Sequence, residues 1–402
     1  MHFEDSPQEA AFRAEVRAWF EANAERTTEA SQSLSVMEAF DDTPEGLARA
    51  KEWQRKLSEA RWSAITWPAE YGGRGSGPLE SIVLGEELGR YDVPVQIFTI
   101  GLGMIGPTLI AHGTPEQKQR YLPAMLRGDE IWCQLWSEPD AGSDLASLKT
   151  RADRDGDHFV LNGQKVWTSG AHYCDFGLGV FRTDPNEPKH AGISALVVAM
   201  DTPGITIRPL RQLNGASHFN EVFFDDARVP AENLVGDIND GWRVARTTMM
   251  NERLSAGAGV SLGEAMAPML ALARRATSNG SAATADPRIR QRLAHAYTSS
   301  KLFDLTTARV RTAIANNAIP GPEVSVLKLF AALAGTEMAE VGIDLLGPAG
   351  MLAGDDGVEA GRWVEGLLAS FAMHIGGGTD EIQRNIIGET VLGLPREPRV
   401  TN

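Results

Sequence analysis

The chain has 402 residues, of which 43% are hydrophobic, and its formal net charge is −15. This length allows two or three domains with a sizeable core, and the negative charge disfavours binding to nucleic acid or to an anionic membrane surface. No uninterrupted apolar run is long enough to span a membrane, and the N-terminal residues lack the pattern of a signal peptide. The two cysteines, Cys133 and Cys174, are expected to be reduced thiols, so the composition predicts a cytoplasmic protein.

The first 130 residues carry mostly helical patterns. Ser6 to Glu9 has the form of a capping box, and apolar residues at helical spacing follow it. A turn-rich break lies at residues 67–75. Further helical patterns cover residues 44–60, 79–88 and 115–126.

From about residue 131 to 240, short strands between turns replace the helices. The segment from His158 to Trp167, with Asn162-Gly163 at its centre, predicts a β-hairpin that turns at those two residues. Further strands are expected at residues 193–198, 205–209 and 221–224.

After Gly241, long helical patterns return. They cover residues 242–273, 289–316, 323–346 and 358–371, with Pro320 to Pro322 between two of them. The order of elements predicts an α+β protein with three parts. These are an N-terminal helical domain (1–130), a small central β domain of barrel or sandwich type (131–240), and a C-terminal four-helix bundle (241–402).

One glycine pattern suggests a different fold. Gly101-Leu-Gly-Met-Ile-Gly106 matches the fingerprint of a dinucleotide-binding turn. A Rossmann domain also needs a βαβ rhythm around the turn and an acidic residue about 20 positions further on, and the sequence has neither. We therefore interpret this segment as a helix that packs closely through its glycines.

Three segments resemble those of one enzyme family. Trp132 to Asp144 reads Trp-Cys-Gln-Leu-Trp-Ser-Glu-Pro-Asp-Ala-Gly-Ser-Asp, and Asn162 to Ser169 reads Asn-Gly-Gln-Lys-Val-Trp-Thr-Ser. Ile375 to Arg384 reads Ile-Gly-Gly-Gly-Thr-Asp-Glu-Ile-Gln-Arg. In order and spacing these segments resemble the acyl-CoA dehydrogenases, and the resemblance covers essentially the whole chain. It implies the acyl-CoA dehydrogenase fold, FAD as cofactor and an acyl-CoA thioester as substrate.

The resemblance also assigns residues to the cofactor. Trp167 would pack against the isoalloxazine ring, and Ser169 would donate its hydroxyl to flavin N5, where negative charge arrives on reduction. Ser143 would lie near the thioester end of the substrate. The full set of implied cofactor residues is Gln134, Trp136, Ser137, Ser143, Trp167, Thr168, Ser169, Gly347, Ala349, Gly350, Thr379 and Glu381. The implied substrate contacts are Ser143, Asn251, Arg253 and Gly377.

Dehydrogenation next to a thioester needs a base for the α-proton. The usual glutamate of the family is replaced by Gly377, which retains a backbone N–H for the thioester carbonyl. A subset of the family, including the isovaleryl-CoA and long-chain enzymes, places the glutamate on a helix in a Glu-Arg pair, which here is Glu252 and Arg253. Partial desolvation beside Met249 and Met250 would raise the pKa of Glu252 and make it a better base. We predict Glu252 as the base; a surface carboxylate paired with a nearby basic residue is the alternative.

Partners and assembly follow from the same resemblance. It implies an electron-transfer flavoprotein as the electron acceptor and a tetramer that shares its flavin sites between subunits. The Arg-x-x-Phe-Gly flavin segment of the family is missing, since Arg274 to Gly280 stands near its place, and Asp344 replaces a common glutamine. Both a homotetramer and an α2β2 heterotetramer, as in actinobacterial enzymes for steroid side chains, therefore remain open.

Two other functions also remain open. One is an accessory subunit that needs a catalytic partner, and the other is a flavin oxidase acting on a non-CoA substrate. The histidines do not show metal-ligand spacing, so no metal site is predicted.

Overall fold

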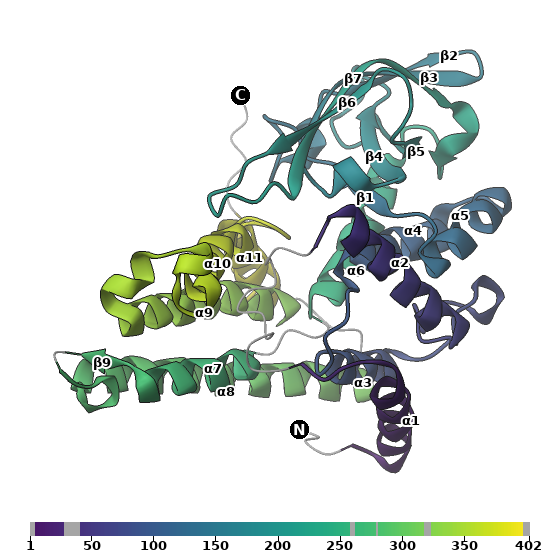
Figure 1. Cartoon of the computed structure of the whole chain (residues 1–402). Helices are drawn as coiled ribbons and strands as arrows, with labels where there is room; N and C mark the ends of the chain where they lie inside the picture. Colours follow the sequence, from purple (N-terminus) through teal and green to yellow (C-terminus); the bar gives the residue numbers. More distant parts are fainter. Residues whose placement is uncertain (1–4, 28–40, 258–261, 279, 317–322, 397–402) are drawn as a thin grey trace. The chain divides into compact units, whose positions relative to one another are not determined.

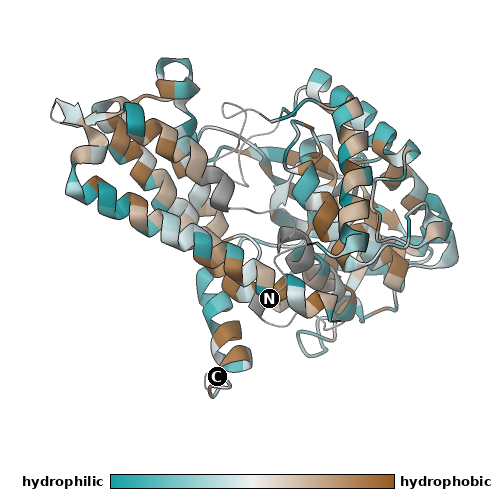
Figure 2. Ribbon diagram, turned by 90° about the horizontal axis from the view of Figure 1, so that it is seen from below, coloured by the Kyte–Doolittle hydropathy of each residue, from teal (hydrophilic) through white to brown (hydrophobic). Residues whose placement is uncertain are grey.

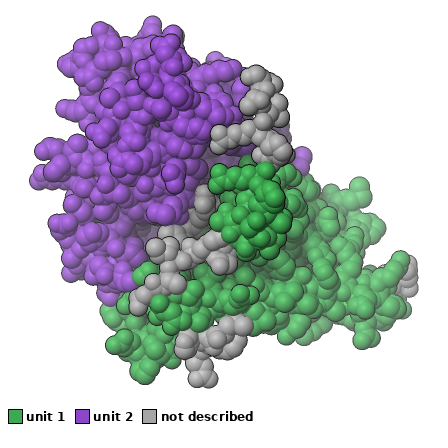
Figure 3. All heavy atoms as spheres, turned by 180° about the vertical axis from the view of Figure 1, so that it is seen from behind, with its two compact units in different colours: residues 1–38, 78–92, 256–402 green, residues 39–77, 93–255 purple. Residues whose placement is uncertain are grey.

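The computed structural model describes residues 5–27, 41–257, 262–278, 280–316 and 323–396. The chain forms two compact units, which Figure 3 shows in different colours. Unit 1 comprises Met1–Glu38, Pro78–Asp92 and Ala256–Asn402, and unit 2 comprises Ala39–Gly77 and Val93–Ser255. The N-terminal helical region therefore contributes to both units.

Unit 2 combines helices with a mixed sheet (Figure 1). Its helices are α2 (Pro44–Glu59), α4 (Gly106–His112), α5 (Pro115–Arg127) and most of α6 (Gly241–Gly257). Its strands are β1 (Trp132–Leu135), β2 (Arg151–Asp155), β3 (His158–Ser169), β4 (Phe176–Arg182), β5 (Ile193–Ala199), β6 (Ile205–Leu210), β7 (Phe219–Pro230) and β8 (Leu234–Val235). The strand order is β6-β7-β3-β2-β4-β5-β8, and β1 pairs with β4.

The predicted turn at Asn162-Gly163 is wrong. β3 runs through both residues, and the hairpin with β2 turns at Gly156 and Asp157. Gly163 pairs with Phe224 of β7, next to a register shift in the ladder. A Cβ at Gly163 would lie 2.6 Å from Thr150 Oγ1, so the glycine permits a close approach between chain segments rather than a turn.

The glycine-rich segment is helical, as predicted. Residues Gly101–Ile105 form a π-helical turn that continues into α4. A Cβ at Gly106 would lie 2.0 Å from the Trp67 indole ring, and Trp67 is almost completely buried. Close helix packing therefore accounts for the glycine here, without a bound nucleotide.

Unit 1 is mainly helical (Figure 1). Its elements are α1 (Pro7–Asn23), α3 (Pro78–Leu88), α7 (Leu262–Arg275), β9 (Thr277–Ser278), β10 (Ser281–Ala282), α8 (Pro287–Ala315), α9 (Glu323–Leu346), α10 (Arg362–Ser370) and α11 (Asp380–Ile386). The predicted capping box is confirmed, since the Ser6 side chain accepts from Glu9 N while the Glu9 carboxylate accepts from Ser6 N.

Two predicted helices of the C-terminal part of the chain differ in extent from those observed. The pattern at 242–273 is described as two helices, α6 and α7, and residues 258–261 between them lie outside the described residues. The pattern at 358–371 becomes an α-helix only at Arg362, because Glu359 and Ala360 have left-handed backbone angles. Pro320 to Pro322 lie outside the described residues.

Apolar faces of α7, α8, α9 and α10 form the core of the C-terminal part of unit 1. Trp363, which is 2% exposed, packs against Gly342 of α9, where a Cβ would clash with the indole ring. Figure 2 shows hydrophobic and hydrophilic residues alternating around these helices, as expected for elements that bury one stripe.

A cluster of ionic contacts joins the helices α1, α3 and α8 of unit 1. Arg311 of α8 donates to Asp5, Glu9 and Glu86 at 2.7–3.1 Å, and its side chain is only 17% exposed. Arg13 of α1 pairs with Asp5 and Glu86, both at 2.6 Å. Because each arginine binds carboxylates from other parts of the chain, the cluster fixes how these three helices meet.

No helix in the described part of the chain is long and apolar enough to cross a membrane. Cys133 and Cys174 are free thiols, the first of them buried.

Candidate active site

The two segments predicted to bind the flavin ring meet at one place in unit 2. Val166 N donates to Ser137 O at 2.8 Å, and Lys165 Nζ donates to Trp136 O at 3.0 Å. β1 therefore leads into a loop that runs beside the last residues of β3, as the sequence analysis requires for a shared site.

Buried polar atoms without partners gather in these two segments. Gln134 Nε2, Trp136 Nε1 and Thr168 Oγ1 are buried, and none of them has a hydrogen-bond partner within the described part of the protein. Most buried polar groups in folded proteins are hydrogen-bonded, so such a group of unpaired atoms needs an explanation. A polar ligand that supplies the missing partners is one explanation that fits.

Trp167 has an unusual position for a large apolar side chain. It is 60% exposed, although its neighbours Val166 and Thr168 are buried. Its φ is +59°, and it lies at a register shift between Lys165 and Thr168. A bulky residue rarely adopts this backbone conformation, and such strain is concentrated at functional sites. The ring of Phe219 lies against that of Trp167, with the two ring centroids 6.0 Å apart, and half-buried Ser169 follows two residues later. Trp167 therefore offers an aromatic surface, and Ser169 a hydroxyl, to a planar cofactor.

A buried ion pair, Lys165 with Glu138, joins the same two segments. Lys165 is 0% exposed, and its ammonium donates to Glu138 Oε1 at 2.8 Å. Burial lowers the pKa of Lys165 to about 8, although the Glu138 carboxylate acts in the opposite direction. Burial also raises the pKa of Glu138, but Lys165 and the Lys149 N–H outweigh it and hold that pKa below its ordinary value. Both groups are therefore charged at neutral pH.

The sequence analysis assigned no role to Lys165 or Glu138. A signal was present, because Lys165 stands at an even spacing from Phe159 and Leu161, the two inward-facing apolar residues of β3. A lysine in phase with apolar residues needs a buried partner.

Glu252 lies on α6, whose position in unit 2 is fixed by two hydroxyl contacts. Thr248 Oγ1 is 2.9 Å from Thr108 Oγ1, and both side chains are fully buried. Thr247 Oγ1 is 2.7 Å from His112 Nε2. Glu252 follows Thr248 by four residues and is half-buried, so it lies on the same face of the helix one turn further on.

The helix α6, which carries Glu252, shares a hydrophobic core with the segment around Trp136. Val244 and Ala245 of α6 belong to the same cluster of buried residues as Trp136, and Met249 packs against that cluster. Asn251 is half-buried, and the side chain of Arg253 lies outside the described residues. Ser143, predicted near the thioester, is exposed in the loop after β1.

The third predicted segment belongs to unit 1. Gly377 has a φ of +66°, and its carbonyl accepts from Gln383 Nε2 at 2.8 Å. His374 Nδ1 and Asp380 Oδ2, at the two ends of this loop, are 2.7 Å apart. Thr379 caps α11 by accepting from Ile382 N, whereas Glu381 is exposed.

The residues predicted for the pyrophosphate also belong to unit 1. Gly347, Ala349 and Gly350 form a 3₁₀ turn after α9, in which Gly347 is exposed with a φ of +55°. Asp344, whose charge would oppose a pyrophosphate, forms an ion pair with Arg292. The structure thus groups the predicted ring-binding residues and Glu252 in unit 2, and the predicted pyrophosphate residues in unit 1.

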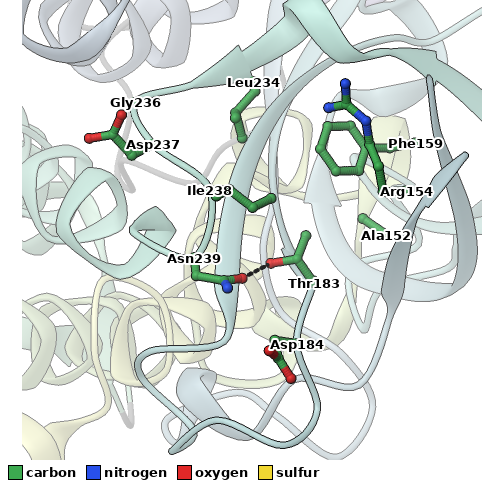
Figure 4. Close-up of a pocket in the computed structure, with 10 residues that line it drawn as sticks. All are labelled: Ala152, Arg154, Phe159, Thr183, Asp184, Leu234, Gly236, Asp237, Ile238 and Asn239. Carbon is green, nitrogen blue, oxygen red and sulfur yellow. Dashed lines mark hydrogen bonds between the residues drawn. The ribbon is translucent and has the colours of Figure 1, made fainter. Parts of the chain in front are cut away.

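A cavity of about 400 Å³ lies elsewhere in unit 2 (Figure 4). Its lining includes Arg154, Phe159, Asp184 and Asn239, and Thr183 donates to Asn239. Phe159 and Trp167 are eight residues apart on β3, which corresponds to roughly 26 Å along an extended strand. The cavity is therefore distinct from the predicted flavin site. Within the described residues, no group of three His, Cys, Asp or Glu side chains is placed to hold a metal ion.

Three family models match the chain in sequence order. The N-terminal domain of acyl-CoA dehydrogenases matches residues 6–129, the middle domain residues 133–227, and the C-terminal domain residues 239–392. The chain is also 40% identical over 400 residues to the acyl-CoA dehydrogenase IpdE1 of Mycobacterium tuberculosis, covering 96% of this chain and 98% of the relative.

Solved structures agree with this assignment. The Tcur3481-Tcur3483 steroid ACAD has a TM-score of 0.81 at 31% identity and covers 99% of this chain and 100% of that chain. The ChsE4-ChsE5 complex of Mycobacterium tuberculosis gives a TM-score of 0.80 at 29% identity, with coverage of 99% and 100%. The predicted fold, a helical N-terminal region, a central sheet and a helical C-terminal region, is confirmed. The chain belongs to the acyl-CoA dehydrogenase family, whose members are FAD-dependent oxidoreductases.

Proposed function

We propose that this chain catalyses the α,β-dehydrogenation of an acyl-CoA thioester to a trans-2-enoyl-CoA. The observation that carries the proposal is the arrangement in unit 2, where exposed Trp167 and the unpaired polar atoms of Gln134 and Trp136 lie in two joined segments. The family membership and Glu252 on α6 support the same reaction.

The residues divide the chemistry between them. FAD, when bound, supplies the acceptor for the β-hydride at its N5 atom. Gln134, Trp136, Ser137 and Thr168 would hold its ring system against Trp167. Ser169 would donate its hydroxyl where negative charge develops on reduction.

On the substrate side, Glu252 would remove the α-proton, with Ser143, Asn251 and Arg253 contacting the substrate. The Gly377 N–H would polarise the thioester carbonyl, which stabilises the enolate-like charge that forms as the proton leaves. In unit 1, Gly347, Ala349, Gly350, Thr379 and Glu381 would contact the pyrophosphate and adenosine. Small residues suit that role because they let the backbone approach closely.

The substrate class follows from the relatives. We propose a bulky, steroid-derived acyl-CoA rather than a straight-chain fatty acyl-CoA, because the chain is similar over 99% of its length to a protein titled a steroid ACAD. Electrons would pass to an electron-transfer flavoprotein, and the setting would be the cytoplasm.

The assembly we propose is an α2β2 heterotetramer, in which this chain is the catalytic member because it carries Glu252. Two similar structures have titles that pair two proteins. A homotetramer is the alternative assembly. An accessory subunit would need a catalytic partner chain and would be purified without bound flavin, and a flavin oxidase would release hydrogen peroxide without an external acceptor.

The reaction can be tested directly on the purified chain with bound FAD. A steroid-type acyl-CoA, incubated with an artificial electron acceptor, should yield a product that has lost two hydrogens and carries a trans α,β double bond. Mass spectrometry and proton NMR identify it. A chain that is purified without flavin, and that supports conversion only when a catalytic partner chain is added, would support the accessory-subunit alternative.

Replacing Trp167 with Ala is expected to weaken FAD binding while leaving the fold intact. Stacking on an aromatic side chain is worth about 1–3 kcal/mol, which corresponds to roughly 5- to 150-fold in the dissociation constant. The 60% exposure of Trp167 predicts little change in the melting temperature of the FAD-free protein. FAD titration of that protein measures the affinity, and Leu213→Ala, at an exposed apolar residue of the same unit, is the matched control. Equal losses of FAD affinity in both variants would show that Trp167 does not contact FAD.

A further inference from the structure

We propose that Lys165 is a positioning residue of the FAD site, whose buried ammonium, held by Glu138, fixes and polarises the peptide bond between Trp136 and Ser137. This inference rests on the proposed function, because it takes the segments around Trp136 and Trp167 as the binding surface for the flavin ring. Neither Lys165 nor Glu138 has a part in the proton or hydride transfer.

The pair is enclosed and fully engaged. Lys165 donates to both Glu138 Oε1 and Trp136 O, at 2.8 and 3.0 Å. Glu138, which is 7% exposed, also accepts from Thr150 N at 3.0 Å and from Lys149 N at 2.6 Å. The carboxylate is thus held by three donors, the Lys165 ammonium and two consecutive backbone N–H groups, which leaves it unsuited to acid-base chemistry and well suited to orienting Lys165.

The ammonium connects the two flavin segments. Lys165 precedes Trp167 by two residues on β3, and its side chain reaches Trp136 of the loop after β1. The backbone hydrogen bond from Val166 N to Ser137 O joins the same two segments. A shift of the Lys165 side chain would therefore change the spacing between the aromatic surface of Trp167 and the backbone of the opposite segment.

The contact also has an electrostatic consequence. A cation at the Trp136 carbonyl draws electron density through the peptide bond, so the N–H at its other end, that of Ser137, becomes a stronger donor. Ser137 is half-buried beside the unpaired polar atoms described above. A stronger, fixed donor at a flavin ring stabilises the negative charge of the reduced ring, which raises its reduction potential.

Fold stability alone does not explain a buried ion pair at this position. Well-packed apolar residues are often as stabilising as a buried pair, because both charges lose their hydration. Lys165 carries an additional cost, since Arg182 is close enough to lower its pKa further. Lys165 is therefore better explained by its effect on the peptide bond between Trp136 and Ser137, which it fixes and polarises, than by its contribution to stability.

The test uses the full chain, with FAD removed and added back. The variants are Lys165→Met, Glu138→Gln and the double variant. The control is Lys301→Met, which breaks the ion pair between Lys301 and Asp304 on α8, whose side chains are 53% and 38% exposed. Three quantities are measured: the FAD dissociation constant, the flavin reduction potential, and the melting temperature of the FAD-free protein.

We expect Lys165→Met to raise the FAD dissociation constant on the order of tenfold or more, as for residues that orient metal ligands, and to lower the reduction potential. The double variant leaves neither charge unpaired, so it should recover most of the melting temperature but not the FAD affinity or the potential. Lys301→Met should leave all three quantities unchanged.

Two results would overturn the inference. In the first, the double variant recovers FAD affinity and potential together with stability, which would make the pair purely structural. In the second, all three variants fail to fold, which would also make the pair purely structural. A wild-type chain that binds no FAD, either alone or with its partner subunit, would refute the proposed function itself, so the two failures are distinguishable.

Discussion

Replacing Glu252 with Gln should retain FAD and lower turnover by at least 10²- to 10⁴-fold, because the amide cannot accept the α-proton. The amide has nearly the same shape, so α6 should remain fixed by the contacts of Thr248 with Thr108 and of Thr247 with His112. The flavin absorption spectrum and substrate affinity should therefore change little while the chemical step fails. Rapid-mixing measurement of flavin reduction isolates that step.

The control for this variant is Glu59→Gln. Glu59 is an exposed carboxylate at the end of α2 in the same unit, so its neutralisation should leave the rate unchanged. Near-normal flavin reduction in the Glu252 variant would assign the base to another residue. Gly377 cannot supply one, because it has no side chain.

Replacing Arg311 with Met should destabilise unit 1 by roughly 1.5–3 kcal/mol, because one partly buried cation serves three carboxylates there. Without Arg311, Asp5 and Glu86 would keep their ion pairs with Arg13, and Glu9 would keep its hydrogen bond from Ser6 N. Urea unfolding followed by circular dichroism measures the loss. Arg288→Met is the matched control, because the Arg288 side chain is 85% exposed where it pairs with Asp286, and it should cost less than about 1 kcal/mol.

The same variant has a defined pH dependence. Hydrogen bonds from Arg13 and Arg311 lower the pKa of Asp5 from 3.8 to about 2, and Arg311 lowers the pKa of Glu9. A depressed carboxyl pKa stabilises the folded state above the unfolded pKa, and that contribution is lost as pH falls through the folded pKa. The stability gap between wild type and the Arg311 variant should therefore be constant near pH 7 and narrow below about pH 4. A gap that widens in acid would contradict this account.

Local signals explain most of what the sequence predicted correctly. The capping box at Ser6 and the strands at 193–198 and 205–209 depend on neighbouring residues, and the structure has them within a residue or two. The turn predicted at Asn162-Gly163 failed because the same dipeptide also suits a strand that must pass close to Thr150. Only the three-dimensional neighbour distinguishes the two.

The ionic contacts could not be predicted in the same way. Lys165 and Glu138 are separated by 27 residues, and Arg311 and Asp5 by 306. Each pairing depends on how distant elements pack, and a charged residue in the sequence does not identify its partner. The assignment of two segments to the flavin ring rests on the family resemblance and stays a prediction. The unpaired atoms of Gln134, Trp136 and Thr168 became visible only with the fold.

The proposed reaction is tested most directly by anaerobic titration of the FAD-bound chain with straight-chain, branched and steroid-type acyl-CoAs. Reduction by the substrate bleaches the flavin absorption without any external acceptor. We expect steroid-type esters to bleach the flavin at far lower concentrations than straight-chain esters. In the Glu252→Gln variant we expect no bleaching by any of these esters. Bound FAD that no acyl-CoA bleaches, with or without a partner subunit, would contradict the account.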